Sequence, residues 1–234
     1  MVKIKDMKAI ILAAGKGTRM GEHTQNTPKP LLQIGGKPIL EHTLRALPRS
    51  IDEALIVVNY LSGQIKDYFS YKFGDVRISY MDQKEFLGTA NAVWEARPRL
   101  NGEKFLVVNG DDLYNQADLE ECLNHDLAFG VIKKIPPSDK FIAIDIGQNQ
   151  NIAGFHKLEP PELKKEIFVA TGAYVLDDKI FKYEPVRLST GEFGLPQTIL
   201  NMAKDYPVRA VLMKKWSQIN YPEDILKAEI NFTF

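Results

Sequence analysis

The sequence has little of what builds disulfide scaffolds, zinc sites or membrane spans. Its 234 residues include one cysteine, Cys122, which has no second cysteine to pair with inside the chain. The four histidines are scattered without the i, i+3 or i, i+4 spacing of histidine-built zinc sites. The longest apolar stretch, residues 9–14, is far below the roughly 18 residues of a membrane span or the roughly 7–15 of a secretory signal. We therefore expect a cytoplasmic chain without membrane contact.

Neither sign of charge is in excess, since 30 Lys and Arg face 30 Asp and Glu. Affinity for nucleic acid comes from many Lys and Arg acting together, so we expect no nucleic-acid partner. The charge is unevenly distributed, however. Residues 1–50 hold nine Lys or Arg and three Asp or Glu. This local positive excess suits a small, highly charged anion.

Apolar β-type runs alternate with helical patterns through the first half of the chain. Strands are predicted near residues 8–14, 54–59, 76–81 and 104–109, and helices near 37–47, 62–70, 88–97 and 116–124. This spacing predicts an α/β fold with βαβ units, a mostly parallel sheet and helices on both faces. Ligands of such sheets bind beyond the carboxyl ends of the strands.

The second half has shorter strand-like runs, and we expect mixed α+β structure there. Strands are predicted near 127–134, 141–146, 152–157, 168–176 and 208–213, and helices near 195–204 and 222–230. No repeat or low-complexity linker divides the chain. We therefore predict one domain over 1–234, with a first lobe over about 1–125 and a second over about 126–234.

A glycine-rich, cationic turn follows the first predicted strand. Glycines at 15 and 17 let backbone N–H groups converge on oxygen ligands, and Lys16 and Arg19 would add charge-assisted hydrogen bonds. A dinucleotide fingerprint would need glycine where Met20 stands, and a Walker A loop needs Lys-Ser/Thr after its last glycine. Further along, Lys29 lies between two prolines that stiffen its backbone. These residues form a candidate phosphate site, with a plain surface loop as the alternative.

Together, the segments Leu12–Met20, Pro28–Leu31 and Gly36–Leu40 resemble the signature of the sugar-1-phosphate nucleotidylyltransferases. The resemblance is strongest over residues 7–112 and continues to about 230. It implies a Rossmann-like fold, a sugar-binding second lobe and the reaction of an NTP with a sugar 1-phosphate to give an NDP-sugar and pyrophosphate, with Mg²⁺. Some relatives carry a β-helical tail for acetyl transfer or trimerisation, which is missing here, so we expect no second activity. The oligomeric state stays open.

The resemblance also implies roles in nucleotide binding. It assigns Arg19 and Lys29 to catalysis and the triphosphate to a loop made of Leu12, Ala13, Ala14, Gly15, Gly17 and Thr18. The segment 83–92 resembles the base-recognition segment, with Gln83, Gly88 and Thr89 as its contacts. A glutamine amide both donates and accepts, which suits uracil or thymine, so we favour UTP or dTTP. The alternative is a plain helix start with Thr89 near the cap.

The metal site is expected after the apolar run Phe105–Val108. Side chains alternate along a strand, so Asn109 and Asp111 should share one face, while Asp112 points elsewhere and caps the next turn. The resemblance assigns Mg²⁺ to Asp111, a hard oxygen ligand. The second ligand is expected from residues 216–226, where we prefer Asn220 to Gln218.

The remaining assignments concern the sugar phosphate. The resemblance gives Lys157 to the phosphate, with His156 replacing the glutamate of the family's Glu-Lys pair. It places Asn109, Thr171, Gly172 and Glu192 near the sugar. Many members have glycine where Ile142 stands, so the identity of the sugar is not predicted.

A sugar 1-phosphate, whose second pKa is about 6, is largely dianionic at neutral pH and needs no general base. The barrier is electrostatic, which explains a site rich in cations and poor in histidine. One alternative is a cytidylyltransferase for phosphocholine or a polyol phosphate, which shares the N-terminal signature. Another is a catalytically silent relative that binds nucleotide-sugars or a partner protein, because Gln218 and His156 depart from the pattern.

Overall fold

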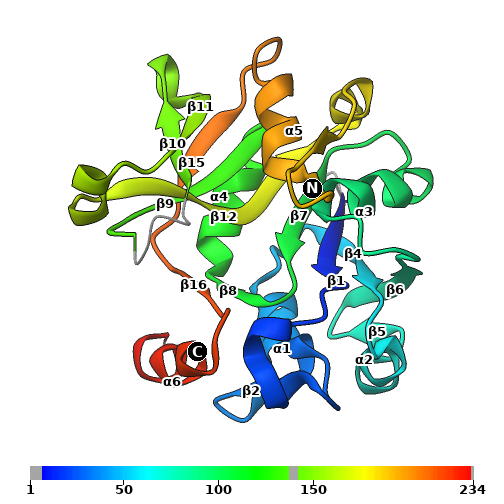
Figure 1. The fold of residues 1–234 in the computed structure, drawn as a ribbon. Coiled ribbons are helices and arrows are strands. Elements are labelled where there is room, and N and C mark those ends of the chain that lie inside the picture. The colour runs from blue at the N-terminus through cyan, green and yellow to red at the C-terminus, as the bar shows by residue number, and fades with distance from the viewer. Residues whose placement is uncertain (1–6, 137–141, 233–234) are drawn as a thin grey trace.

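A single eight-stranded sheet forms the centre of the structure, a computed structural model that describes residues 7–136 and 142–232 (Figure 1). The strand order is β15-β9-β12-β7-β1-β4-β6-β5. The strands are β1 (Met7–Ala13), β4 (Ile51–Val58), β5 (Lys72–Phe73), β6 (Val76–Asp82), β7 (Phe105–Asn109), β9 (Ala128–Lys134), β12 (Ile167–Leu176) and β15 (Arg209–Leu212). Strands β7, β1, β4 and β6 are parallel, and β12 joins them antiparallel to both β7 and β9.

Both faces of the sheet are buried because its central strands are almost entirely apolar. In β1, Ile11 belongs to one core cluster and Ile10 to the other, as the alternation of side chains requires. The first face is covered by α1 (Ile39–Ala46), α2 (Ser62–Phe69) and α4 (Gln116–Leu123), and the second by α3 (Thr89–Ala96) and α5 (Leu195–Met202). The predicted α/β class with a mostly parallel sheet is confirmed.

Within residues 7–136 and 142–232, four small two-stranded sheets accompany the central one. They pair β2 (Gln33–Ile34) with β3 (Lys37–Pro38), β8 (Asp112–Tyr114) with β16 (Trp216–Gln218), β10 (Ile142–Ile146) with β11 (Ile152–Lys157), and β13 (Val186–Arg187) with β14 (Phe193–Gly194). The last helix, α6 (Pro222–Asn231), packs through Ala228 on a third cluster that includes Ile34 and Ile219. Among the described residues, six 3₁₀ helices complete the elements: η1 (Thr18–Thr24), η2 (Lys29–Leu31), η3 (Arg97–Arg99), η4 (Gln148–Gln150), η5 (Pro160–Lys164) and η6 (Asp178–Lys182).

The predicted elements differ from the observed ones mainly where strands are short. The helix predicted from residue 37 begins at Ile39, because residues 37–38 pair as β3 and Pro38 precedes the first turn. Strand β4 begins three residues before its predicted start. Residue 141, the predicted start of one strand, lies outside the described residues. Over the described ranges, every helix is too short or too polar to cross a bilayer.

Candidate active site

The ammonium of Lys29 and the carboxylate of Asp111 meet beyond the carboxyl end of β7. Lys29 begins the turn η2 directly after Pro28, whose backbone is extended. Its Nζ donates a hydrogen bond to Oδ2 of Asp111 at 2.5 Å, and Lys29 is only 5% exposed. The structure therefore brings together two predicted site residues that are 82 positions apart in the sequence.

The glycine-rich turn packs against Lys29. Gly17 has a left-handed φ of 65°, and a Cβ added there would lie 2.9 Å from Cβ of Lys29. Any side chain at this position would therefore be strained and would press on Lys29. At the exit of β1, the carbonyl of Leu12 accepts a hydrogen bond from the N–H of Gly110 at 2.9 Å, which ties the turn to the Asp111 segment.

The other predicted loop residues differ in exposure. Gly15, Thr18 and Arg19 are exposed, whereas Ala13 and Ala14 are buried. The exposed members are the ones that a ligand in solution can reach. Ala13 and Ala14 instead shape the turn by packing.

Asp112 has a role that the alternation of side chains did not predict. We expected it to cap a turn, but it begins β8 and is only 2% exposed. The chain turns at Gly110, between β7 and β8, so the extended pattern assumed for Asn109–Asp112 does not continue. The Asp112 carboxylate accepts hydrogen bonds from Nδ2 of Asn109 at 3.1 Å and from the backbone N–H of Ile219. Burial, followed by the neighbouring charge of Asp111, raises the pKa of Asp112 to about 7.

The pairing of β8 with β16 brings the last part of the chain to this acidic pair. Gln218 lies opposite Asp112, and Ile219 hydrogen-bonds its carboxylate. Asn220 follows directly and lines a cleft of about 820 Å³ together with Arg19. The guanidinium carbon of Arg19 lies 6.0 Å from the ring centroid of Tyr221, at the start of α6. Arg19 and Asn220, both predicted site residues, therefore share one cleft.

The predicted base-recognition segment lies beside the predicted sugar residue Glu192. A Cβ added to Gly88, whose φ is 93°, would lie 2.6 Å from the carbonyl oxygen of Phe193 and 3.0 Å from Cβ of Glu192. Thr89 was considered as a helix cap, but the observed N-cap is Gly88, and the Thr89 hydroxyl accepts a hydrogen bond from the N–H of Leu195.

Gln83 is buried, and its amide is already engaged. Its Nε2 donates to Oδ1 of Asn91 at 2.8 Å and to the carbonyl of Gly88 at 3.3 Å. Both N–H donors are therefore used inside the protein, and Oε1 is the atom left to contact a base. The donating half of the predicted base contact is therefore wrong, and the accepting half stays a prediction.

Asn109, Thr171 and Gly172, which were predicted to lie near the sugar, are close together in the fold. A Cβ added to Gly172, whose φ is 73°, would collide with the Asn109 amide. The hydroxyl of Tyr114 donates to the carbonyl of Thr171 at 3.0 Å and accepts from the N–H of Asn109 at 3.2 Å. The Thr171 hydroxyl, in contrast, is fully buried and donates to the carbonyl of Gly130, so its side chain has a structural role.

Lys157 ends β11 on the face of the hairpin that is turned to the cleft. It pairs with Ile142, and both Ile142 and Phe155 line the cleft. Directly opposite residues of an antiparallel pair share one face, as do alternate residues of a strand. By the same alternation His156 lies on the other face, where Asp145 and Glu162 contact it. His156 therefore does not take the place of a sugar-contacting glutamate.

Sequence reasoning missed several residues of this region. Tyr114 was not considered because its role depends on the short pair of β8 and β16. Trp216 and Tyr221 line the cleft, and their only signal was their place in the segment predicted to supply the second metal ligand. For Asp112 the signal was the two consecutive acids after a strand.

The donors beside Asp111 fit a hard divalent cation. The Asp111 side chain is 36% exposed and offers carboxylate oxygens, and Asn220 lines the cleft that it shares with Arg19. Asp111 and Asp112 place two carboxyl groups side by side, and a bound cation would reduce the repulsion between them. In the part of the chain that the structure describes, no three His, Cys, Asp or Glu side chains gather as a metal cage. Few protein ligands are usual for Mg²⁺, which keeps several waters and binds substrate phosphates.

Comparison with known proteins identifies the family. The sequence model of the nucleotidyl transferase family matches residues 8–232. The chain belongs to the nucleotidyl transferase family. This confirms the resemblance to sugar-1-phosphate nucleotidylyltransferases that was predicted from the N-terminal motifs.

Individual relatives show how far the similarity extends. The bifunctional protein GlmU of Methanocaldococcus jannaschii is 35% identical over 95% of this chain and 53% of its own length. The D-glycero-α-D-manno-heptose 1-phosphate guanylyltransferase of Campylobacter jejuni is 29% identical over 96% of this chain and 100% of its own. A UDP-glucose pyrophosphorylase solved with UDP-glucose has the same fold, with a TM-score of 0.81, 20% identity and coverage of 97% and 98%. The chain thus spans about half the length of the GlmU proteins it matches.

Proposed function

We propose that this nucleotidyl transferase joins an NTP to a sugar 1-phosphate, giving an NDP-sugar and pyrophosphate. The observation that carries the proposal is the pairing of Lys29 with Asp111 at 2.5 Å, beyond the carboxyl ends of the parallel strands. This is the edge at which ligands of such sheets bind. Arg19 and Asn220 line a cleft of about 820 Å³, and Asn220 directly follows Ile219, whose N–H bonds the Asp112 carboxylate next to Asp111.

The proposed chemistry is attack of one anion on another. A phosphate oxygen of the acceptor forms a bond to the α-phosphorus, and the bond from that phosphorus to the departing pyrophosphate breaks. The acceptor is already dianionic near pH 7, so no proton has to be removed from it. Lys29 would stabilise charge at the α-phosphate, Arg19 at the leaving phosphates, and Lys157 would hold the acceptor phosphate.

Mg²⁺ is the metal that we propose for this site, held by Asp111 and Asn220. When bound, it would neutralise phosphate charge and help to align the reacting groups. The backbone N–H groups of Gly15, which is exposed, and of the half-buried Gly17 would contact the same phosphates.

For the base, we propose that Oε1 of Gln83 accepts a hydrogen bond from a ring N–H. Uracil and thymine carry such a group, which supports UTP or dTTP, and cytosine lacks it on the corresponding edge. Guanine also carries a ring N–H, so GTP belongs in the test. Because both N–H groups of Gln83 are engaged, they do not distinguish these bases.

A pyrophosphate-release screen tests the proposal. The purified chain with Mg²⁺ is given UTP, dTTP, GTP or CTP in combination with a panel of sugar 1-phosphates, phosphocholine and polyol phosphates. We expect release with a sugar 1-phosphate and with UTP or dTTP. Turnover with CTP and phosphocholine or a polyol phosphate would identify a cytidylyltransferase instead. Calorimetric binding of an NTP without turnover on any acceptor would indicate a silent relative.

A further inference from the structure

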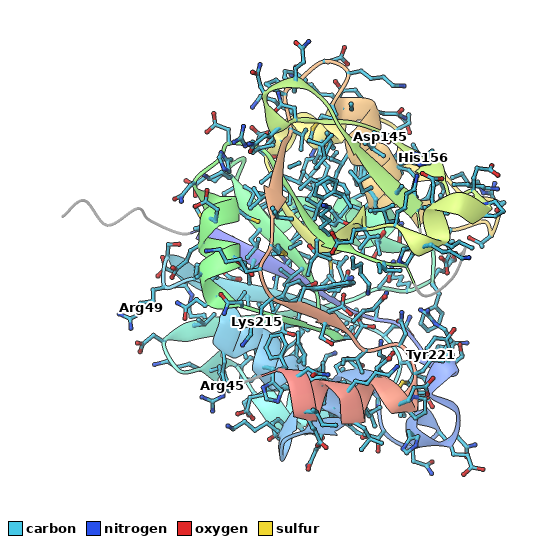
Figure 2. The ribbon with its side chains drawn as sticks, turned by 90° about the vertical axis from the view of Figure 1, so that its left-hand side faces the viewer. Arg45, Arg49, Asp145, His156, Lys215 and Tyr221 are labelled. Atoms are coloured by element: carbon cyan, nitrogen blue, oxygen red, sulfur yellow. The ribbon has the colours of Figure 1, made fainter. Side chains whose placement is uncertain are left out.

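His156 bridges two carboxylates that come from different elements. Its Nδ1 lies 2.9 Å from Oδ1 of Asp145 on β10, and its Nε2 lies 2.9 Å from Oε1 of Glu162 on η5. Figure 2 shows Asp145 and His156 together on the hairpin, on the same side of that view as Tyr221 at the start of α6. An imidazole can donate from both nitrogens only when it is protonated.

The bridge fixes the chain on both sides of Lys157. His156 precedes Lys157 directly on β11. After Lys157, the second carboxylate oxygen of Glu162 accepts a hydrogen bond from the N–H of Glu159 at 2.9 Å and closes the turn η5. The Lys157 backbone therefore lies between two points that the same imidazole connects.

The charged groups around His156 favour its protonated form. Among the described residues, Glu162 from η5 and Asp145 from β10 are the charged groups that act on the imidazole, and both raise its pKa above the ordinary value of 6.5. The pKa of the Glu162 carboxyl is lowered by the hydrogen bond from the Glu159 N–H, then by His156 and least by Lys165, which follows η5. Neutral His156 keeps one N–H and turns a lone pair toward the other carboxylate.

We propose that His156 is a positioning residue, which in its protonated form bridges Asp145 and Glu162 and so holds Lys157 toward the acceptor phosphate. This rests on the proposed function, because it takes Lys157 as the acceptor-phosphate ligand. As the pH rises through the titration of His156, one arm of the bridge is lost. The acceptor is then bound more weakly, while the NTP site is unaffected.

Steady-state kinetics between pH 6.5 and 9 test this step, because the acceptor phosphate is mostly dianionic over that range and its dianionic fraction only increases with pH. For the wild-type chain, KM for the sugar 1-phosphate should rise by about fivefold at most, the size of an exposed ion pair, with KM for the NTP unchanged. In H156Q, which cannot titrate, KM for the acceptor should not change with pH. The matched control is H125Q, because His125 also lies beside a carboxylate, Glu121, at 3.6 Å. It should keep the wild-type profile.

A second variant distinguishes titration of His156 from loss of packing. D145N keeps a hydrogen-bonding group but removes one negative charge, so it should lower the pKa of His156. The rise in KM should then begin at lower pH, in step with the His156 ring signals followed by NMR. Equal pH profiles for wild type and H156Q would overturn the proposal, as would a rise that does not follow the NMR titration.

The failure of the proposed function would look different. If the wild type released no pyrophosphate with any acceptor, the proposed function would fail, although NMR would still report whether His156 titrates with its two carboxylates. If the wild type were active but K157A left KM for the acceptor unchanged, Lys157 would not be the phosphate ligand. The His156 bridge would then hold no residue that contacts the acceptor, and the inference about His156 would be wrong.

Discussion

At the scale of single residues, Lys29 is the side chain on which the proposed chemistry depends most. It is buried, it ion-pairs with Asp111, and Gly17 packs against its stem. We expect Lys29→Ala to lower kcat by roughly 10²-fold, as removal of one preorganised charge-stabilising donor does. Lys72→Ala, in the exposed edge strand β5, is the control and should leave kcat unchanged. A wild-type kcat for Lys29→Ala, measured by pyrophosphate release, would remove this residue from the mechanism.

Asp112 should make the stability of the metal-free protein depend on pH. Its folded-state pKa of about 7 lies above the ordinary aspartate value of about 3.9, so the folded state binds this proton more tightly than the unfolded state. The contribution of Asp112 to stability therefore falls as the pH rises from about 4 to about 7, and it stays lower above that range. Asp112→Asn removes the effect.

Thermal unfolding in EDTA measures this dependence. The Tm of Asp112→Asn minus the Tm of the wild type should be higher at pH 8 than at pH 5. Asp75→Asn, at an exposed position, should show the same small difference at both pH values. An equal Tm difference for Asp112→Asn at the two pH values would contradict the raised pKa.

At the scale of elements, Gly88 is the N-cap of α3 and packs closely against Phe193 of β14. An added Cβ would lie 2.6 Å from the Phe193 carbonyl oxygen and 2.8 Å from its nitrogen, at a φ of 93° that side chains rarely adopt. We expect Gly88→Ala to destabilise the fold by about 1–3 kcal/mol, the usual cost of overpacking. Because Gly88 adjoins both Glu192 and the Gln83 amide, KM for the NTP should rise as well.

Gly63 provides the matched control. It lies inside α2, and an added Cβ would have open space around it. Gly63→Ala should be neutral or stabilising by up to about 1 kcal/mol, because alanine is the better helix former. Urea unfolding compares the two variants. Equal stability changes would show that the contact with Phe193 has no cost.

The elements that could be predicted from the sequence are those with a repeating pattern. Strands β1 and β7 are continuous apolar runs, and the helices between strands have the 3.6-residue period, so both were found within a few residues. The pair of β8 and β16 has three residues on each strand and joins distant parts of the chain. No local pattern marks such a pair, and the burial of Asp112 and the role of Tyr114 depend on it.

At the scale of the whole molecule, only the site residues that belong to sequence motifs could be predicted. Lys29, Asp111 and Arg19 belong to motifs in the first half; the structure pairs Lys29 with Asp111 and places Arg19 in the cleft with Asn220, and their roles stay predictions. The internal hydrogen bonds of Gln83 and the bridge at His156 depend on side chains that meet only in the folded chain. Sequence spacing does not contain this information.

Metal binding should connect the middle of the chain with its C-terminal part, because its proposed ligands are Asp111 and Asn220. We expect EDTA to abolish pyrophosphate release and Mg²⁺ to restore it. In Asn220→Ala the Mg²⁺ concentration for half-maximal activity should rise by about tenfold, near the low end of what loss of a metal-supporting group costs.

Gln218→Ala is the discriminating control for this assignment. Gln218 is the other candidate ligand. It also lines the cleft, but it lies opposite Asp112 in the pairing of β8 with β16, two residues before Asn220. Its loss should leave the Mg²⁺ dependence close to wild type. A larger shift for Gln218→Ala than for Asn220→Ala would reverse the assignment of the second ligand. It would place the metal beside β16 instead of at the start of α6, and Asn220 would then serve only to shape the cleft beside Arg19.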